Sequence, residues 1–587
     1  MATLQQIQSS DTKPQRKSRA GTPKVRTGCL TCKERRVKCD ETKPACLRCL
    51  KFWGRCEGYA VPRYRPRRPK DAPRPIADPT SRPLLPLLKD SPGTQSYLDP
   101  SDFQPLHRSI ATQSFKSPDH YQSYAHFLEN TSNSLPGFFK SDLWKCLLPQ
   151  ASYDTLFICS ALIAIGALSG CGRKFQEDKF ATSGMVITPR YRFALSQYGT
   201  AVSQMRENLV AGEKGLNHAL IACLLVVCFE CIQGNYFSAL THSVSGHKIF
   251  KDWLNSKNKQ LITESSSSGP MHQPKGHFNI VVEDELVAVF SRMDLQIMSY
   301  IDPRPASIHM EMKNEGEESV QNMPDRFTDI HESRVYLELV QRRTSHFIAS
   351  TAGMYPAPEN GSSTRTTRIA TGTETGTVTV RPESETLLPS SAPPALRIEY
   401  SGYVSELLRW FKAFTPLFES LVEGSRDWVA AAVLQIEAQT HQVMLLSSFS
   451  YPLDYFTPTY RSVVDLAEKI SDDPLFAQRD LYMFDMGIVN PLRLVAKWCR
   501  EPTIRRKCIM LLRKTKCKEG LWDALCMAAV TEWQMEIEEE YMDENGIIPE
   551  EARCRTVDLK VDNWKRSLVV KLARLGTGEI RSTVIEW

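Results

Sequence analysis

Residues 29–56 have the sequence CLTCKERRVKCDETKPACLRCLKFWGRC, in which six cysteines follow the spacing C-x2-C-x6-C-x6-C-x2-C-x6-C. The segment C-x2-C-x6-C occurs twice, once from Cys29 and once from Cys46. Each C-x2-C pair brings two thiolates to one metal ion across a tight turn. The opening stretch, MATLQQIQSS, lacks the apolar core of a signal peptide, so we expect an intracellular protein. In that setting a tight cysteine cluster predicts a metal site rather than disulfides.

The number of thiolates fixes how the metal is held. A structural zinc ion takes four ligands, so six thiolates suffice for two ions only if two of them bridge. The symmetric choice makes the first cysteine of each repeat, Cys29 and Cys46, the bridges. Since thiolates fill every position, none is left for water or substrate. We therefore predict six metal ligands: Cys29, Cys32, Cys39, Cys46, Cys49 and Cys56.

The charge of the 587-residue chain is distributed unevenly around this cluster. Between Lys13 and Arg74 there are 20 Lys and Arg against 5 Asp and Glu, a net charge of +15. The remainder has 53 basic against 62 acidic residues and carries −9. A small basic head on an acidic body predicts a polyanionic partner for the head alone, and nucleic acid is the expected one.

From Thr27 to Tyr59 the sequence resembles the fungal binuclear zinc cluster DNA-binding family. The resemblance rests on all the cysteine spacings, on the basic run 33–38 and on the proline loop 43–46 between the two halves. It implies two short helices packed around two Zn²⁺ ions, in which the metal replaces a hydrophobic core. It also implies double-stranded DNA as the partner and the nucleus as the location.

In the family that this stretch resembles, the end of the first helix enters the major groove. On that pattern Arg35 and Arg36 lie nearest the base edges of a CGG-type triplet, because a guanidinium pairs bidentately with guanine. Four further residues would contact phosphates: Lys33, Lys38, Arg48 and Lys51. For each of these side chains the alternative is a solvated surface charge.

Composition divides the chain into four parts. They are a disordered basic tail (1–26), the zinc cluster domain (27–58), a Pro-rich basic linker (59–118) and an all-α regulatory domain (119–587). Ser, Thr, Gly and Pro accumulate near 256–277 and 353–394, which predicts flexible insertions there. The expected fold class is therefore mainly α.

Apolar periodicity predicts many helices in the fourth part. They are Tyr121–Asn130, Asp142–Leu148, Tyr153–Leu168, Tyr191–Leu209, Leu216–Ile232, Tyr236–Leu254, Tyr403–Leu421, Trp428–Ser447, Tyr460–Ile470, Leu492–Trp498, Pro502–Thr515 and Leu521–Tyr541. The longest apolar run, 156–168, is too short for a membrane span, so we expect a buried helix and no membrane partner. Patches such as Leu216–Ile232 followed by Gly234-Asn235 also resemble, more loosely, the middle region of fungal regulators. That resemblance implies a regulatory domain.

Other patterns in the body are weaker. Cys228 and Cys231 lie one helical turn apart, and His242 and His247 share a predicted helix. We expect the two cysteines, which share an apolar helix with Cys223, to pack in the core, because cysteine packs as a small hydrophobe; a metal or redox role is the alternative. The two histidines lack acidic or cysteine companions at ligand spacing, so we expect them to be core or surface residues. The acidic stretch 532–544 is either an activation surface or, as we favour, an amphipathic helix with a solvated acidic face.

The segment after the cluster bears on dimerisation. Prolines at positions that include 62, 66, 69, 73 and 75 exclude heptads between residues 60 and 100, and with them a coiled coil. We therefore expect any homodimer to form through the helical body beyond residue 120. The basic arms 16–19 and 63–70 are expected to serve nuclear import or DNA backbone contact, the alternative being solvated tails.

Together these features predict a sequence-specific DNA-binding transcription factor that regulates RNA polymerase II genes and contacts the transcription machinery. The alternative is a helical scaffold or co-regulator with only auxiliary DNA contact. An enzyme is not expected, because the sequence lacks the G-x-G-x-x-G, P-loop, H-E-x-x-H and G-x-S-x-G motifs.

Overall fold

The structure, a computed structural model, divides into two compact units, Met1–Ser81 and Arg82–Trp587. In the first unit it describes residues 29, 32, 39, 40, 42, 46–49 and 56. In the second it describes residues 115–171, 188–209, 215–264, 277–300, 302–351, 393–448, 452–473, 482–562 and 567–586. Of the predicted parts, the tail 1–26 and almost all of the linker 59–118 lie outside these residues.

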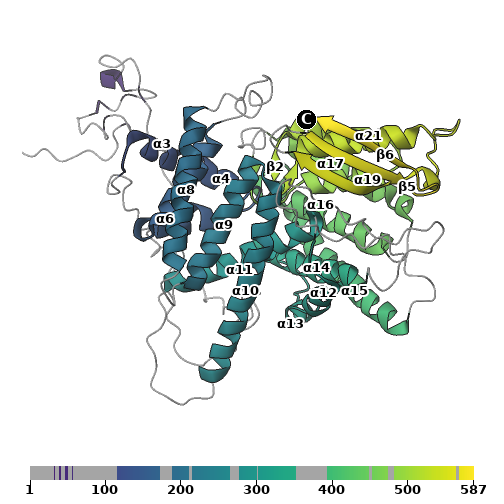
Figure 1. Cartoon of the computed structure of the whole chain (residues 1–587), viewed down its shortest axis with the longest axis horizontal. Coiled ribbons are helices and arrows are strands. Elements are labelled where there is room, and N and C mark those ends of the chain that lie inside the picture. Colours follow the sequence, from purple (N-terminus) through teal and green to yellow (C-terminus); the bar gives the residue numbers. More distant parts are fainter. Residues whose placement is uncertain are drawn as a thin grey trace, which may run out of the picture. The chain divides into compact units, whose positions relative to one another are not determined.

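The first half of the larger unit is helical (Figure 1). Its elements are α3 (Pro118–His126), the π-helical turn η3 (Phe127–Thr131), α4 (Ser132–Ser134), η4 (Leu143–Leu147), α5 (Leu148–Asp154), α6 (Leu156–Ser169), α8 (Pro189–Leu209), α9 (Gly215–Gln233), α10 (Tyr236–Glu264) and α11 (His277–Tyr300). Helix α6 packs along α8 and α9, and α10 packs along α9 and α11. At Gly166 a Cβ atom would lie 2.1 Å from the carbonyl oxygen of Ser123, so only glycine lets α6 approach α3 this closely.

The second half contains further helices and two small sheets. Its helices are α12 (Ala306–Met312), α13 (Glu317–Gln321), α14 (Ile330–Thr351), α15 (Pro394–Ser420), α16 (Arg426–Ser447), η5 (Leu453–Phe456), α17 (Thr457–Asp472), α19 (Val489–Trp498), α20 (Pro502–Thr515), α21 (Ala524–Glu539) and η6 (Glu550–Ala552). Its strands are β1 (Tyr482–Met483), β2 (Lys518–Glu519), β3 (Trp522–Asp523), β4 (Cys554–Asp562), β5 (Ser567–Arg574) and β6 (Ile580–Glu586). Strands β1, β2 and β3 form one sheet, and β4, β5 and β6 form an antiparallel second one.

The mainly α fold class is confirmed, but the body is not helical throughout. Residues 554–562, 567–574 and 580–586 form the sheet β4-β5-β6, which the sequence prediction of an all-α domain missed. The period-two pattern is present in β5, where Leu568, Val570 and Leu572 are buried. Helix α10 also continues to Glu264, so the insertion predicted near 256–277 begins later than expected. Residues 265–276 and 352–392 lie outside the described part of the chain.

Local signals explain where several C-terminal helices begin and end. Helix α20 has the predicted bounds, because Glu501 accepts the N–H of Ile504 at 2.6 Å and Lys516 ends the helix with a φ of 48°. Helix α21 begins where Asp523 accepts two backbone N–H groups. At α19 the buried carboxylate of Glu519 accepts the first N–H groups, and burial raises the pKa of Glu519 to about 7.

Two hydrophobic cores meet between α11 and α14. Leu286 and Phe290 of α11 belong to the core of the first half, whereas Leu337 of α14 belongs to the core of the second. Strand β1 lies between them, since Tyr482 joins the first core and the next residue, Met483, joins the second. None of the described helices offers a long enough apolar stretch to cross a membrane.

Buried charged side chains also connect α11 and α14. Asp294 is fully buried and accepts hydrogen bonds from Nη1 of Arg304 at 2.6 Å and from Nε2 of His346 at 3.0 Å. Nε of Arg342 donates to the same carboxylate at 3.3 Å. The Nδ1 atoms of His346 and His309 lie 2.9 Å apart, which extends the network to α12. We call these five residues the Asp294 cluster.

A second group of charges lies on the same pair of helices. Arg292 and Arg334 donate to the two carboxylate oxygens of Asp485 at 3.0 and 2.8 Å, and Arg334 also binds Glu338 at 2.6 Å. The guanidinium of Arg334 lies 3.7 Å from the ring centroid of Phe139. Charged residues on the inward faces hide the apolar periodicity of α11 and α14, which explains why neither helix was predicted from the sequence.

We predict that Asp294→Ala destabilises the full-length protein by about 3–5 kcal/mol, because it removes the fully buried carboxylate that Arg304, Arg342 and His346 share. Urea unfolding followed by far-UV circular dichroism measures the change. The control is Asp465→Ala, which removes an exposed carboxylate paired with Lys507 and should change stability by less than about 1 kcal/mol. Equal effects of the two substitutions would contradict the role given to the Asp294 cluster.

The stability of the protein should also decrease as the pH is lowered, because His441 of α16 is buried. Burial lowers the pKa of His441 to about 3, below its usual 6.5, so the unfolded chain binds the proton first as pH falls. Between pH 7 and pH 5 the native state should lose about 2 kcal/mol from this group. Unfolding of His441→Gln at both pH values should show a pH dependence smaller by that amount. The matched control is the same substitution at an exposed histidine, His331→Gln.

Candidate metal centre

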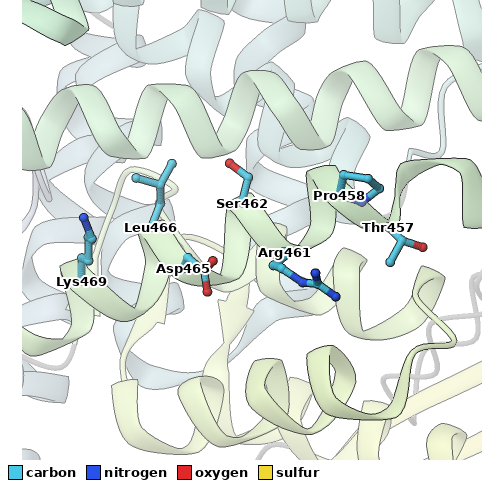
Figure 2. Close-up of a pocket in the computed structure, with 7 residues that line it drawn as sticks. All are labelled: Thr457, Pro458, Arg461, Ser462, Asp465, Leu466 and Lys469. Carbon is cyan, nitrogen blue, oxygen red and sulfur yellow. The ribbon is translucent and has the colours of Figure 1, made fainter.

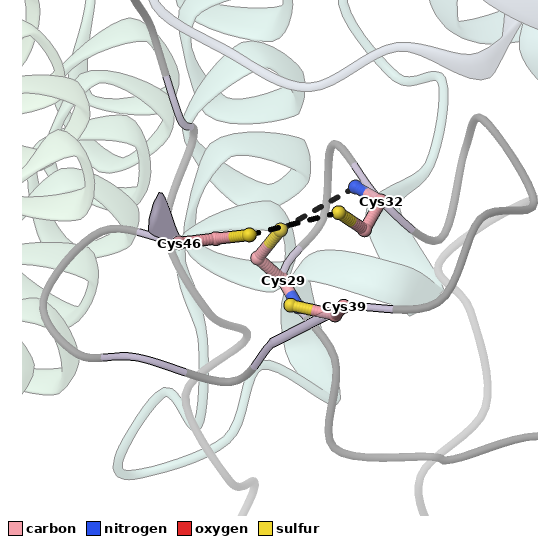
Figure 3. A group of neighbouring side chains, drawn as sticks. All are labelled: Cys29, Cys32, Cys39 and Cys46. Carbon is pink, nitrogen blue, oxygen red and sulfur yellow. Dashed lines mark hydrogen bonds between the residues drawn. The ribbon is translucent and has the colours of Figure 1, made fainter. Parts of the chain in front are cut away.

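The cysteine sulfur atoms of residues 29–56 lie together in the first unit. Their Sγ atoms fall into two groups, in each of which all members lie within 4.8 Å of one another. The first group is Cys29, Cys32, Cys39 and Cys46, whose sulfurs point toward a common centre in Figure 3. The second is Cys29, Cys49 and Cys56. Cys29 belongs to both groups, as a bridging ligand must, whereas Cys46 belongs to the first.

The two halves of the sequence repeat are also equivalent in space. The backbone N–H of Cys29 donates to Sγ of Cys39 at 3.3 Å, and that of Cys46 donates to Sγ of Cys56 at the same distance. Each contact joins the first and third cysteine of one half.

Contacts between the halves obey the same symmetry. Sγ of Cys29 lies 3.8 Å from Sγ of Cys49, and Sγ of Cys46 lies 3.8 Å from Sγ of Cys32. Cys32 and Cys49, the second cysteines of their halves, have sulfurs 3.5 Å apart. An approximate two-fold axis therefore exchanges the halves and runs between these two sulfurs.

The donor set suits zinc. Five of the six cysteines are buried, and burial raises the pKa of the Cys32 thiol to about 12. Such a group of thiols becomes a set of thiolates only when a cation compensates the charge, which couples metal binding to deprotonation and folding. Soft thiolate ligands in sets of four favour zinc over the hard cations Mg²⁺ and Ca²⁺.

Asp40 holds the second half against the first. One carboxylate oxygen accepts the backbone N–H of Arg48 at 2.6 Å, at the helical turn 47–49, and the other accepts the N–H and hydroxyl of Thr42. The backbone hydrogen bond from Thr42 lowers the pKa of Asp40 to about 2, so the side chain is an anion at neutral pH. Sequence reasoning missed this residue, although an Asp two positions before a Thr is a common turn pattern.

Of the residues predicted to contact DNA, Arg48 lies within the described part of the chain. Its side chain is exposed on the turn 47–49, while Cys49 on the same turn is buried in the cluster. The other predicted contacts lie outside the described residues: Lys33, Arg35, Arg36, Lys38 and Lys51.

Two features of the body are further candidates for a functional site, and both fit that role less well than the cysteine cluster does. The Asp294 cluster is enclosed and its groups bind one another, which fits a packing role. A shallow groove on α17, with a volume of about 560 Å³, is shown in Figure 2. The lining residues all project from one helix: Thr457, Pro458, Arg461, Ser462, Asp465, Leu466 and Lys469. Lys469 pairs with Glu423 at 2.8 Å, and no histidine or cysteine lines the groove, so no catalytic set is assembled there.

Comparison with known families agrees with the geometry. Residues 27–66 match the family described as the fungal Zn(2)-Cys(6) binuclear cluster domain. This segment is a fungal zinc cluster domain. It contains all six converging cysteines, Asp40 and Arg48, and the family it belongs to identifies zinc as the metal. The resemblance seen in the sequence is thus confirmed for the domain.

Several proteins that are similar to this chain are named as transcription regulators. The chain is 28% identical over 232 residues to the aspercryptin biosynthesis cluster-specific transcription regulator atnN of Emericella nidulans, covering 38% of this chain and 34% of that one. It is 64% identical over 36 residues to the transcriptional regulatory protein moc3 of Schizosaccharomyces pombe, covering 6% and 7%. A 23% identity over 257 residues relates it to the transcription regulator lscL of Purpureocillium lilacinum, covering 41% and 52%. The chain therefore matches about a third of the first relative's length and less than a tenth of the second's. No solved structure matches it.

Proposed function

We propose that the protein is a sequence-specific DNA-binding transcription factor of the nucleus that regulates RNA polymerase II genes, and that it is not an enzyme. The observation that carries the proposal is the closed six-thiol cluster on a strongly basic head. A centre whose positions are all occupied by thiolates supports a fold rather than a reaction. The relatives named as transcription regulators support the same function.

The metal set of the proposal is two zinc ions held by Cys29, Cys32, Cys39, Cys46, Cys49 and Cys56. Zinc supplies structural cross-links, and the chain's own residues do the binding. Cys29 and Cys46 are the proposed bridges, because the approximate two-fold axis exchanges them and Cys29 lies in both sulfur groups. Asp40 fixes the turn that carries Arg48.

DNA contact is assigned to the basic residues of the domain. Arg35 and Arg36 are proposed to face a CGG-type triplet in the major groove, where a guanidinium donates two hydrogen bonds to guanine. The phosphate contacts are proposed to come from Lys33, Lys38, Arg48 and Lys51. Arg48 is exposed and lies next to a buried cysteine, which supports its assignment to the surface that faces DNA.

The helical body is proposed to bring two copies together and to contact the transcription machinery. A proline-rich segment follows the cluster, which argues against a dimer formed by a coiled coil at that place. If the body acted alone as a scaffold, loss of DNA binding by the head would leave the regulatory activity of the protein unchanged. Regulatory activity that survives substitution of all six cysteines would favour that alternative.

The bridging assignment predicts different losses of metal from two similar variants. Cys46→Ala removes a proposed bridge and should lose both zinc ions, whereas Cys56→Ala leaves the complete group Cys29, Cys32, Cys39 and Cys46 and should keep one. Native mass spectrometry of the full-length protein counts the ions. One zinc retained in Cys46→Ala, with the fold unchanged, would refute the bridge.

The groove assignment predicts that Arg36→Ala weakens binding to a CGG-containing site by about 1–3 kcal/mol and leaves binding to random DNA nearly unchanged. Lys38→Ala should weaken both kinds of DNA evenly and reduce the slope of log K against log salt by about one. Fluorescence anisotropy at several salt concentrations measures both. If each variant loses affinity equally on specific and random DNA, Arg36 is not a base contact.

A further inference from the structure

The sheet β4-β5-β6 has one edge that resembles a docking strand. β6 (Ile580–Glu586) pairs with β5 along its whole length and has no second neighbour within the described part of the chain. Its side chains alternate strictly between exposed and half-buried. An unprotected edge of this kind presents a row of backbone N–H and C=O groups to another strand.

The opposite edge of the same sheet is protected. In β4 the pairing register shifts between Thr556 and Asp558, which marks a β-bulge. Bulges twist an edge and interrupt its regular hydrogen-bonding row, a common device against unwanted pairing. β6 has no register irregularity over the seven pairs from Ser567–Glu586 to Ala573–Ile580. The two edges therefore differ, and only β6 is shaped for strand addition.

The outer face of β6 carries two exposed apolar side chains. Ile580 is 59% exposed and Val584 is 62% exposed, and both stand on the same face as Ser582, which lies midway between them. The inner face is already used, since Ile585 packs on the core and Arg581 pairs with Glu540 of the segment after α21. The exposed apolar pair is thus the part of the strand without a partner in the described structure.

We infer that β6 pairs antiparallel with β6 of a second copy of this chain, about a two-fold axis through Ser582. This register places Ile580 opposite Val584 of the second copy, and Val584 opposite its Ile580. Directly opposite residues in antiparallel strands have Cβ atoms about 4.5–5.5 Å apart, so each exposed apolar side chain covers the other. The result is a continuous six-stranded antiparallel sheet.

The charges along the strand are compatible with this register. Arg581 lies opposite Thr583 of the second copy, and Glu579 lies opposite its Ile585, so no like charges face each other directly. Arg581 also has its own acidic neighbours, Glu540 and Glu579. An unrelated partner strand would need its own apolar residues four positions apart, a spacing that a second copy supplies by symmetry.

This inference names the surface of the homodimer in the proposed function and rests on that part of it. Sedimentation velocity of the full-length protein over a range of concentrations tests it. Ile580→Lys and Val584→Lys should each weaken self-association at least ten-fold, because an ammonium group then faces an apolar side chain twice in the dimer. Both positions are exposed, so the fold of the monomer should be unaffected. Ile398→Lys, at a 73% exposed position of α15, is the matched control and should self-associate like the wild type.

A double variant tests the register itself. In Ile580→Lys/Val584→Glu each lysine lies opposite a glutamate of the second copy, so self-association should recover by at least ten-fold over either lysine variant. A wild-type protein that stays monomeric at all concentrations would overturn the dimer of the proposed function, while DNA binding by the head would stand. A dimer that persists in both lysine variants would overturn the β6 interface alone. Loss without recovery in the double variant would overturn the Ser582 register.

Discussion

Two buried carboxylates, Asp294 and Asp485, hold together the helices on which both cores of the body are built. Each accepts hydrogen bonds from two arginines, and the bonds reach from α11 to α14. An isolated charge in such a place would be strongly unfavourable, so the acids and bases must stay in register for either core to form. Helix α11 packs on the first core and α14 on the second. The hydrogen-bonded charges between the two helices therefore connect two apolar regions that share few side chains.

The zinc cluster domain, in contrast to the body, has too few residues to form an apolar core. Six sulfurs occupy the place of that core, and the equal distances in the two halves follow from the repeated spacing of the cysteines. Asp40 is the exception to the symmetry. It crosses from the end of the first half to the turn 47–49 of the second, and so orients the loop between them.

The sequence predicted the parts of the structure whose cause is local. Spacing alone predicts the convergence of the six cysteines, and capping with a proline at the first position defines α20 at Pro502–Thr515. Helices α11 and α14 escaped prediction because Asp294, Arg334 and similar residues face inward and satisfy one another only in three dimensions. The strands β4 to β6 were missed although β5 alternates, since a short alternating run after a long helical region gives a weak signal. Asp40 required the backbone geometry of the turn to be recognised.

The division of charge gives the two parts of the protein different roles in binding a polyanion. The segment from Lys13 to Arg74 carries +15, whereas the remainder carries −9. The acidic body is repelled by DNA, so affinity and its dependence on salt must arise in the head. The body is then free to use apolar and hydrogen-bonding surfaces, such as β6, whose contacts with protein are little affected by salt. In the proposed dimer, the prolines that follow the cluster in the sequence argue against a coiled coil that would set the distance between two heads on DNA. Under the proposed function, selectivity then depends on each head's own contacts with its triplet more than on a fixed spacing between half-sites.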